Sequence, residues 1–447
     1  MPSRKLRHRA PVQVKAGVVT ARMKRERDDD TRDHEVVCRR RLGSERHQVC
    51  IVDGEGSIAG EQWFPHSGAG LAELCDWLLS IAGEEASAVA VAIEVPHGPV
   101  VDSLIDRGFV VHAINPKQLD RLRDRFSVAG AKDDRRDAYV LGDGVRTDRR
   151  LFRRLHVADP RLIELRAWSR LAEELQEERR RLSNRVHQQL WRYYPQIQTL
   201  TDDLAAPWFL ALWQQVPTPA TAAKVSEKTV TRILKDHRIR RLDATTVLLT
   251  LRKTPLFVAP GTTEAACAHI RNLAARLHLV NQQIKEAHRA LDGLCARLEA
   301  ATENPSGQIH EQHDVTILRS WPGIGRIVLA TLLTEATEPL RRRDYHALRA
   351  LAGTAPVTRR SGKQCFVVRR LACNKRLQNA VHHWSRVAIQ HDTAARRRYD
   401  ALRRRGHGHA RALRTVGDRL LYALCTTLKR QTTYDPTCKT AQIIASR

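Results

Sequence analysis

An unbroken series of apolar residues at three- and four-residue spacing runs from Ile270 to Leu298. This spacing places the apolar side chains on one face of an α-helix through four heptads. A second series, from Leu165 to Val186, keeps the spacing except at Arg179. At about 1.5 Å per residue each helix reaches roughly 45 Å, which is longer than a small domain is wide. We therefore expect two long helices that separate globular units, packed on each other or on a second subunit.

The spacing of these two series fits either a coiled coil or a helical bundle without supercoiling. The stretch between them, residues 195–262, is of mixed composition and is interrupted by prolines. The prolines are Pro207, Pro217, Pro219, Pro255 and Pro260. The sequence assigns this stretch no role.

The first part of the chain has a different pattern. In residues 47–53, Val49, Ile51 and Asp53 alternate with Gln48, Cys50 and Val52, whereas residues 88–95 and 109–115 are almost continuously apolar. Two amphipathic helical patterns separate these strands, and strand patterns stop after Asp159-Pro160. Alternating strands and helices predict an α/β layer. The fold class expected is therefore an α/β unit followed by an all-α remainder.

The charge balance points to a polyanionic partner. The 447 residues include 76 Lys and Arg against 49 Asp and Glu, which gives a formal charge of +27. Fold stability does not require such an excess of positive charge, but the excess would favour binding to a nucleic acid. The sequence has no apolar run of about 18 residues and no signal-peptide pattern. We expect a cytoplasmic protein that binds DNA and no membrane.

Cysteine and histidine spacing argues against a zinc site. The nine cysteines are scattered, with no C-x-x-C pair. We interpret most of them as small buried residues in a reducing compartment. His407 and His409 lie between glycines without a nearby carboxylate or thiol, and we interpret them as part of a loop rather than as metal ligands.

A glycine turn opens the C-terminal unit. The stretch "SWPGIGRIVLATLL", residues 320–333, places Gly323 and Gly325 before an apolar helix, as in a helix-hairpin-helix element. Such glycines let backbone N–H groups approach a phosphate, although glycine turns also serve plain helix packing. Between Glu338 and Arg376 there are eleven Lys or Arg against two acidic residues. This imbalance favours a nucleic-acid surface.

Carboxylates in the α/β unit are candidates for chemistry. Glu94 stands in the apolar strand "AVAVAIEVP", where a carboxylate needs a cation, a hydrogen-bond donor or a metal. Asp134 and Asp137 are three residues apart in "GAKDDRRDAYVLGD" and so share one helix face. Together the three carboxylates would suit Mg²⁺, which in two-metal phosphoryl-transfer sites sits as ions about 4 Å apart.

A simpler interpretation of the second acidic stretch remains open. Asp133, Asp134 and Asp137 would then cap a helix and pair with Arg135 and Arg136. Residue spacing alone does not separate the two interpretations.

The order of motifs along the chain resembles one family. The motifs are "AIEVPHG", "INPKQLDRLR", "GAKDDRRDA", "LRSWPGIGRIVLATLL", "ALRALAGTAPVTRRSGK" and "NKRLQNAVHHWSRVA". Their order and spacing resemble the DEDD-type insertion-sequence transposases, which join an N-terminal RuvC-like domain of RNase H fold to a C-terminal transposase domain. The resemblance covers roughly residues 36–435.

This resemblance implies a division of the chain. Residues 1–35 would be a basic tail, disordered or misread, and residues 36–155 the RuvC-like domain. Long helices of coiled-coil type with an insertion would occupy residues 156–304. The transposase domain, helical and with a helix-hairpin-helix-like element, would occupy residues 305–435, followed by a tail at 436–447.

The resemblance also implies roles for single residues. Glu94, Asp134 and Asp137 match the second, third and fourth acidic residues of the family's Mg²⁺-binding set. Ser361, in "TRRSGK", matches the serine that attacks a DNA phosphate and holds it as a phosphoserine. The residues expected to contact nucleic acid are Gly323, Gly325, Arg359, Arg360, Lys363, Arg369 and Arg370.

The resemblance implies partners as well. Members of the family are guided by a structured noncoding RNA that pairs with target and donor DNA, which would explain a large positive charge without an evident base-reading helix. Long helices and the need to hold several DNA ends suggest a homo-oligomer, a dimer or a tetramer. The hydroxyl of the C-terminal unit and the carboxylates of the N-terminal unit are expected to act on one phosphodiester.

One position departs from the family pattern. In the family the first strand ends in an acidic residue just before a turn like Leu42-Gly43-Ser44-Glu45, and Arg41 occupies that place here. A guanidinium in place of a carboxylate changes the charge of a metal site by two units. Asp53 lies too far along the chain to replace it. Metal occupancy is therefore expected to fall.

Two explanations of Arg41 remain open. Residues 1–41 are either translated out of frame, through a single-base change near codon 42, or belong to a genuine element whose nuclease site has decayed. Either would impair strand exchange. Three functions follow: a transposase or recombinase using Ser361, a catalytically inactive nucleic-acid-binding remnant, and a structure-selective nuclease using metal-activated water.

Overall fold

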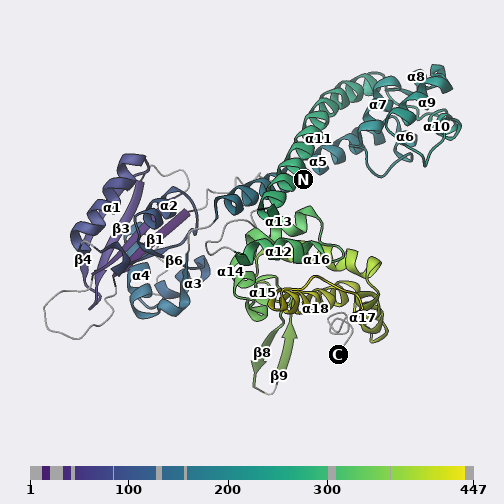
Figure 1. Ribbon diagram of the computed structural model, residues 1–447. Helices are drawn as coiled ribbons and strands as arrows, with labels where there is room; N and C mark the ends of the chain where they lie inside the picture. The colour runs from purple at the N-terminus through teal and green to yellow at the C-terminus, as the bar shows by residue number, and fades with distance from the viewer. Residues whose placement is uncertain are drawn as a thin grey trace. The chain divides into compact units, whose positions relative to one another are not determined.

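The computed structural model describes residues 13–20, 34–41, 46–83, 85–126, 133–155, 159–300, 309–362 and 364–437. The chain forms two compact units, one of residues 1–158 and one of residues 159–447 (Figure 1). The first unit is mixed α/β, and the second is mostly helical. This division in fold class confirms the expectation of an α/β layer followed by helices. None of the described helices is both long and apolar enough to span a membrane.

Unit 1 is built on a seven-stranded sheet in the order β4-β3-β1-β2-β5-β6-β7. The strands are β1 (Gln13–Thr20), β2 (His34–Arg41), β3 (Arg46–Asp53), β4 (Ile58–Pro65), β5 (Val89–Ile93), β6 (Val110–Ala113) and β7 (Arg153–Arg154). β5 and β6 are parallel, and β3 and β4 form an antiparallel hairpin. β1 and β2 pair with each other, and both also pair with β3 and with β5. A strand forms hydrogen bonds along only two edges. β1 and β2 therefore both lie in the one strand position between β3 and β5.

The predicted strands at 47–53, 88–95 and 109–115 are confirmed as β3, β5 and β6. β4 was not predicted, because it lies at the sheet edge and most of its residues are exposed or half-buried. Residues Gln13–Thr20, in the tail that was expected to be disordered or misread, form a strand. The rest of residues 1–33 lies outside the described residues, as does the tail from 438.

Helices cover both faces of the sheet. They are α1 (Gly68–Ala82), α2 (Pro99–Asp106), α3 (Pro116–Arg123) and α4 (Asp134–Thr147), with short 3₁₀ turns at Ala86–Ala88 and Arg149–Leu151. Alternate residues of β3 point to opposite sides, as expected for a strand: Ile51 packs in the layer of α1 and α2, and Val52 in the layer of α3 and α4. The unit therefore has three layers.

Two long helices open unit 2. α5 (Pro160–Trp191) and α11 (Thr262–Ala300) pack on each other, as the two apolar series predict. At the interruption in the seam, the Arg179 Nε donates to Asn281 Oδ1 at 2.8 Å and its Nη2 to Asp203 Oδ2 at 2.7 Å. The polar residue in the apolar seam is thus satisfied by hydrogen bonds.

The stretch between the long helices forms a small helical subdomain. Its helices are α6 (Pro195–Gln198), α7 (Pro207–Gln215), α8 (Pro219–Lys224), α9 (Glu227–Asp236) and α10 (Ala244–Leu251). They gather at one end of the α5–α11 pair (Figure 1). Three of these helices begin with a proline in the first turn, where its missing N–H costs nothing. The prolines therefore start helices as well as end them.

The remainder of unit 2 is helical apart from one hairpin. The helices are α12 (Ile309–Arg319), α13 (Arg326–Glu335), α14 (Thr337–Arg341), α15 (Tyr345–Leu351), α16 (Lys375–His391), α17 (Thr393–Arg404) and α18 (His409–Arg430). The strands β8 (Val357–Ser361) and β9 (Gln364–Val368) form an antiparallel hairpin that stands away from the helices (Figure 1). α13 packs on both α5 and α16, which joins this part to the long helices.

Candidate active site and nucleic-acid interface

The first predicted acidic residue, Glu94, follows β5 directly. All five residues of β5 are buried, and the chain leaves the sheet at Glu94, whose side chain is half-buried. Glu94 therefore lies at the carboxyl end of a central strand. That edge of an open α/β sheet is where ligands are commonly bound.

The other two acidic residues lie in the first turn of α4. Asp134 is the first residue of this helix and is half-buried. Asp137 lies one turn further, facing the sheet, and is fully buried. Asp133 occupies the N-cap position but makes no capping hydrogen bond with its side chain. Capping alone thus does not account for these carboxylates.

Asp137 is held by an arginine from another helix. Arg123, the last residue of α3, donates from Nη1 to both carboxylate oxygens of Asp137 at 3.0 Å. The Arg123 side chain is 15% exposed and that of Asp137 is 0% exposed, so little solvent screens this pair. Arg123 also pairs with Asp120 through Nη2. One guanidinium therefore bridges two carboxylates.

This arrangement corrects the interpretation in which Arg135 and Arg136 neutralise the aspartates. Arg135 is turned toward β4 instead, where its Nε donates to Glu61 Oε1 at 2.7 Å. The partner of Asp137 is Arg123, 14 residues away in the sequence. Residue spacing within "DDRRD" could not show this, because the partner comes from the preceding helix.

The acidic residues as placed do not fit a divalent metal ion. Within the described residues, no group of three or more His, Cys, Asp or Glu side chains is arranged to hold one. Both oxygens of Asp137 are occupied by a cation that belongs to the protein. The side chain of Arg41, at the position of the first acidic residue, lies outside the described residues. The expected Mg²⁺ ion thus lacks a complete donor set here.

Ser361 lies at the tip of the β8–β9 hairpin. It is the last residue of β8, it is exposed, and it pairs with Gln364 across a two-residue loop. The first loop residue, Gly362, has φ +54°, which suits the tight turn of such a hairpin. In the described part of the chain, the Ser361 hydroxyl makes no hydrogen bond. It is therefore accessible to a substrate from outside.

Several of the eleven basic residues between Glu338 and Arg376 are used inside unit 2. Arg343 pairs with Asp314 at 2.5 Å, Arg349 with Asp418 at 2.8 Å, and both Arg341 and Arg342 with Glu338. Arg376 pairs with Glu173 of α5. Ion pairs within the folded protein therefore compensate part of the positive charge of this stretch.

The predicted nucleic-acid contacts are among the residues left over. Arg359 and Arg360 are exposed on β8, and among the described residues neither forms an ion pair. Among the described residues, Arg369 donates a hydrogen bond only to the neutral Gln378, from Nη2 at 2.9 Å. Arg370, the next residue, is half-buried. Lys363 lies outside the described residues. The hairpin and the segment after it thus carry uncompensated charge.

The two glycines of the "PGIG" turn differ in their surroundings. Gly323 has φ +90°, and a Cβ atom there would lie 3.1 Å from both the ring and the carbonyl oxygen of Trp384 in α16. Trp384 Nε1 also donates to the Pro322 carbonyl at 3.0 Å. Close helix packing therefore accounts for Gly323 without a ligand. A Cβ at Gly325, the N-cap of α13, would meet nothing within 4 Å.

A second basic cluster was missed by sequence reasoning. Burial, Arg369 and Arg411 lower the pKa of Arg414 in α18, and burial, Arg419 and Arg405 lower the pKa of Arg398 in α17. These shifts show that arginines of α17 and α18 lie close to one another, and such a concentration of positive charge attracts anions. The signal in the sequence was residues 394–414, which hold eight arginines and one aspartate.

The histidines of this region are not arranged as metal ligands. His409 begins α18, and its Nδ1 lies 2.8 Å from the Tyr399 hydroxyl. His407 lies in the short connection between α17 and α18.

Comparison with protein families gives two matches. Residues 42–195 match a DEDD-type model of IS110 elements described as "Transposase", and residues 315–400 match a model described as "Transposase IS116/IS110/IS902 family". The first match begins immediately after Arg41.

Related proteins carry the same kind of name. A mini-circle protein of Streptomyces coelicolor, named as the transposase for IS117, is 31% identical over 395 residues, which cover 87% of this chain and 92% of that protein. The protein y4uE of Sinorhizobium fredii, named as a transposase, is 53% identical over 237 residues, which cover 53% of this chain and 66% of the relative. An uncharacterized protein of insertion element IS110 from S. coelicolor is 26% identical over 74% of this chain.

Proposed function

We propose that this chain, which belongs to the IS116/IS110/IS902 family of transposases, cuts and rejoins DNA with Ser361 as its nucleophile. Membership of the family implies a transposase that acts on DNA. The proposal adds the nucleophile, the residues that surround it and the guide RNA.

The position of Ser361 carries the proposal. Its hydroxyl is exposed at the tip of a hairpin whose outer strand presents Arg359 and Arg360 to solvent. These two arginines have no ion pair among the described residues, so a phosphate can take that place. Guanidinium groups bind phosphate oxygens with two parallel hydrogen bonds, and they would stabilise the charge that develops on a phosphate under attack.

The proposed step exchanges one ester for another. The Ser361 Oγ attacks a backbone phosphorus, a new Oγ–P bond forms, and the bond from phosphorus to one deoxyribose oxygen breaks. The hydroxyl proton of Ser361 passes to a carboxylate, and the departing oxygen takes a proton to become a free hydroxyl. A free hydroxyl is a weak nucleophile, so it needs such a proton acceptor. We assign this role to Glu94 and Asp134, because both oxygens of Asp137 already bind Arg123.

The basic surfaces of unit 2 are assigned to nucleic acid. Arg369 and Arg370 continue from the hairpin, and Arg369 lies near enough to Arg414 to lower its pKa. Gly325 leaves the backbone at the start of α13 open to a phosphate. A structured guide RNA would account for the charge of +27 beyond what one DNA duplex needs. We further propose a homo-oligomer, because strand exchange involves several DNA ends.

The proposed role of the carboxylates in unit 1 depends on the residue at position 41. The family match begins at residue 42, which supports the view that residues 1–41 do not follow the family pattern. The nucleotide sequence upstream of codon 42 distinguishes the two explanations. An alternative frame that encodes an apolar strand ending in aspartate indicates a frame change, and its absence indicates decay of the element.

The test is formation of a covalent protein–DNA adduct. The full chain and its Arg41→Asp variant are incubated with element-end DNA and guide RNA, and adducts are resolved on denaturing gels. We expect an adduct that disappears in Ser361→Ala and persists in Thr358→Ala, an exposed hydroxyl on the same strand. Cleavage that survives Ser361→Ala would instead indicate a nuclease using water, and binding without cleavage would indicate an inactive remnant.

A further inference from the structure

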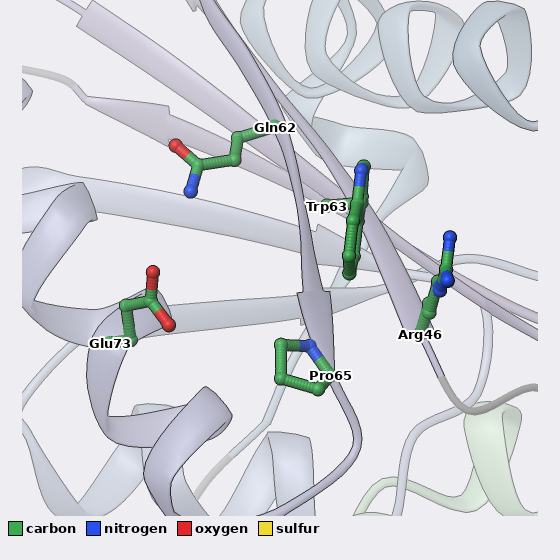
Figure 2. Close-up of a pocket in the computed structure, with 5 residues that line it drawn as sticks. All are labelled: Arg46, Gln62, Trp63, Pro65 and Glu73. Atoms are coloured by element: carbon green, nitrogen blue, oxygen red, sulfur yellow. The ribbon is translucent and has the colours of Figure 1, made fainter.

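An exposed tryptophan and an arginine stack on each other at the edge of the unit 1 sheet. The guanidinium carbon of Arg46 lies 4.1 Å from the ring centroid of Trp63. Trp63 is still 49% exposed, so its ring keeps a free surface beside the guanidinium. Figure 2 shows the two side chains on the same side of β4, lining a cavity of about 570 Å³.

The other residues that line this cavity are Gln62, Glu73 and Pro65. Gln62 and Glu73 lie across β4 from Trp63, and Pro65 lies below it in Figure 2. A large exposed aromatic ring stacked with a cation differs from an apolar protein-docking surface. Aromatic rings and guanidinium planes of this kind stack on nucleobases.

Trp63 and Glu94 face the same side of the sheet. Phe64 packs in the layer of α1 and α2, so its neighbour Trp63 points to the opposite side, where α4 lies. Ala92 packs in the layer of α4. Glu94, two residues further, points to that side as well.

The strand register places the two residues in one row. Val18 of β1 pairs with Ile51 of β3 on one side and with Val91 of β5 on the other, so Ile51 and Val91 are at the same level in the sheet. The pairing of β2 with β3 and β5 gives the same alignment. Because β3 and β5 run in opposite directions, Glu94 is level with Gln48, and Gln48 pairs with Trp63. Because Val18 pairs with both Ile51 and Val91, one strand position separates β3 from β5. Trp63 is thus three strand spacings from Glu94, roughly 14 Å at about 4.8 Å per strand.

We propose that Trp63 and Arg46 form a stacking site for an unpaired base of the DNA strand whose phosphate lies at Glu94. This inference rests on the proposed function, because it takes Glu94 as the place of the reacting phosphate. Roughly 14 Å corresponds to about four nucleotides along one strand at about 3.4 Å each, and to fewer in a stretched strand. Arg46 adds a charge for the phosphate of the stacked nucleotide.

The probe is a single-stranded element-end oligonucleotide with 2-aminopurine placed at successive positions, since stacking quenches its fluorescence. Binding is measured on the full chain in a Ser361→Ala background, so that no chemistry is required. We expect quenching at one position within about four nucleotides of the cleaved phosphate. Trp63→Ala should abolish the quenching and weaken binding by about 5- to 150-fold, whereas Trp63→Phe should retain both.

A matched control is Trp191→Ala, which removes another exposed tryptophan, at the end of α5. It should bind and quench like the parent. A Trp63→Ala protein that melts normally but still quenches overturns the proposal, and so does Trp63-dependent binding of the matching RNA oligonucleotide in preference to DNA. Failure of the Ser361 adduct with intact quenching would reject the proposed nucleophile and leave this site in place.

Discussion

Arg123 binds both carboxylate oxygens of Asp137 through one nitrogen, in the interior of unit 1. Asp137 is one of the residues predicted from the sequence to bind metal, yet its charge is already balanced by Arg123. A buried ion pair of this kind gains little net stability when formed, but it is costly to break from one side.

Removing the arginine should destabilise unit 1. Arg123→Gln leaves Asp137 buried with an uncompensated charge, and we expect a loss of about 3–5 kcal/mol in the free energy of unfolding. Arg125→Gln is the control, because Arg125 pairs with Asp148 while both are about half exposed, and should cost at most about 1 kcal/mol. Urea unfolding of both variants measures the difference. Equal stability of Arg123→Gln and the parent would show that Asp137 does not depend on Arg123.

The same variant should respond to magnesium. In the parent, Arg123 and Mg²⁺ compete for the carboxylate oxygens of Asp137, so millimolar Mg²⁺ should leave the melting temperature unchanged. In Arg123→Gln the carboxylate is released, and Mg²⁺ should raise the melting temperature relative to the same variant with a chelator. Melting curves of both proteins with and without the ion measure this. A parent protein that is itself stabilised by Mg²⁺ would show that Arg123 does not block the site.

The two glycines of the turn should differ in their tolerance of a methyl group. Gly323→Ala places a Cβ at φ +90° against Trp384 and should cost about 1–3 kcal/mol in the stability of unit 2. Gly325→Ala adds its Cβ to open space and should change stability by less than about 1 kcal/mol. Chemical denaturation monitored by tryptophan fluorescence compares them. If Gly325→Ala nevertheless weakens DNA binding, its backbone is used for phosphate contact.

Glu335 should make unit 2 sensitive to acid. Burial would raise its pKa, but the hydrogen bond from Asn374 at 2.8 Å and the charge of Arg170 outweigh it, and the pKa lies below the ordinary 4.5. A lowered pKa in the folded state means that the unfolded state binds the proton more readily. The contribution of ionised Glu335 to folding stability is therefore complete above pH 4.5, and it is lost as the pH falls through the pKa of the folded state.

Glu335→Gln should therefore flatten the dependence of stability on pH below 4.5 and cost about 1–3 kcal/mol at neutral pH. Unfolding at pH 7 and at pH 4 measures both effects. The control is Glu164→Gln, because Glu164 of α5 is an exposed partner of Arg297. A parallel pH dependence in Glu335→Gln and the parent would place the acid sensitivity elsewhere.

The hairpin arginines should contribute to the salt dependence of DNA binding. Removing one cation that binds a phosphate lowers the slope of log affinity against log salt by about 0.9 for duplex DNA. The double variant Arg359→Gln, Arg360→Gln should reduce the slope by about 1.8. Arg180→Gln is the control: Arg180 is exposed and paired with Glu177, so this variant should leave the slope unchanged. Fluorescence anisotropy over a range of salt concentrations measures the slope. An unchanged slope in the double variant would remove the hairpin from the DNA interface.

Local order was predictable where it depends on neighbours in the sequence. The apolar spacing from Ile270 to Leu298 determines α11, and the apolar run before Glu94 determines β5, because helix and strand periods are local properties of the chain. Gly362 after Ser361 and Gly323 of the "PGIG" turn likewise mark tight turns by residue type alone, because a positive φ favours glycine.

Pairing of charges was decided only by the tertiary structure. Arg349 is bound by Asp418, 69 residues away, and Arg123 rather than Arg135 binds Asp137. The alignment of Trp63 with Glu94 across the sheet likewise depends on the register of intervening strands. Residue type and spacing indicate which side chains need a partner. The identity of the partner depends on packing between elements that are distant in the sequence, so a local sequence pattern cannot predict it.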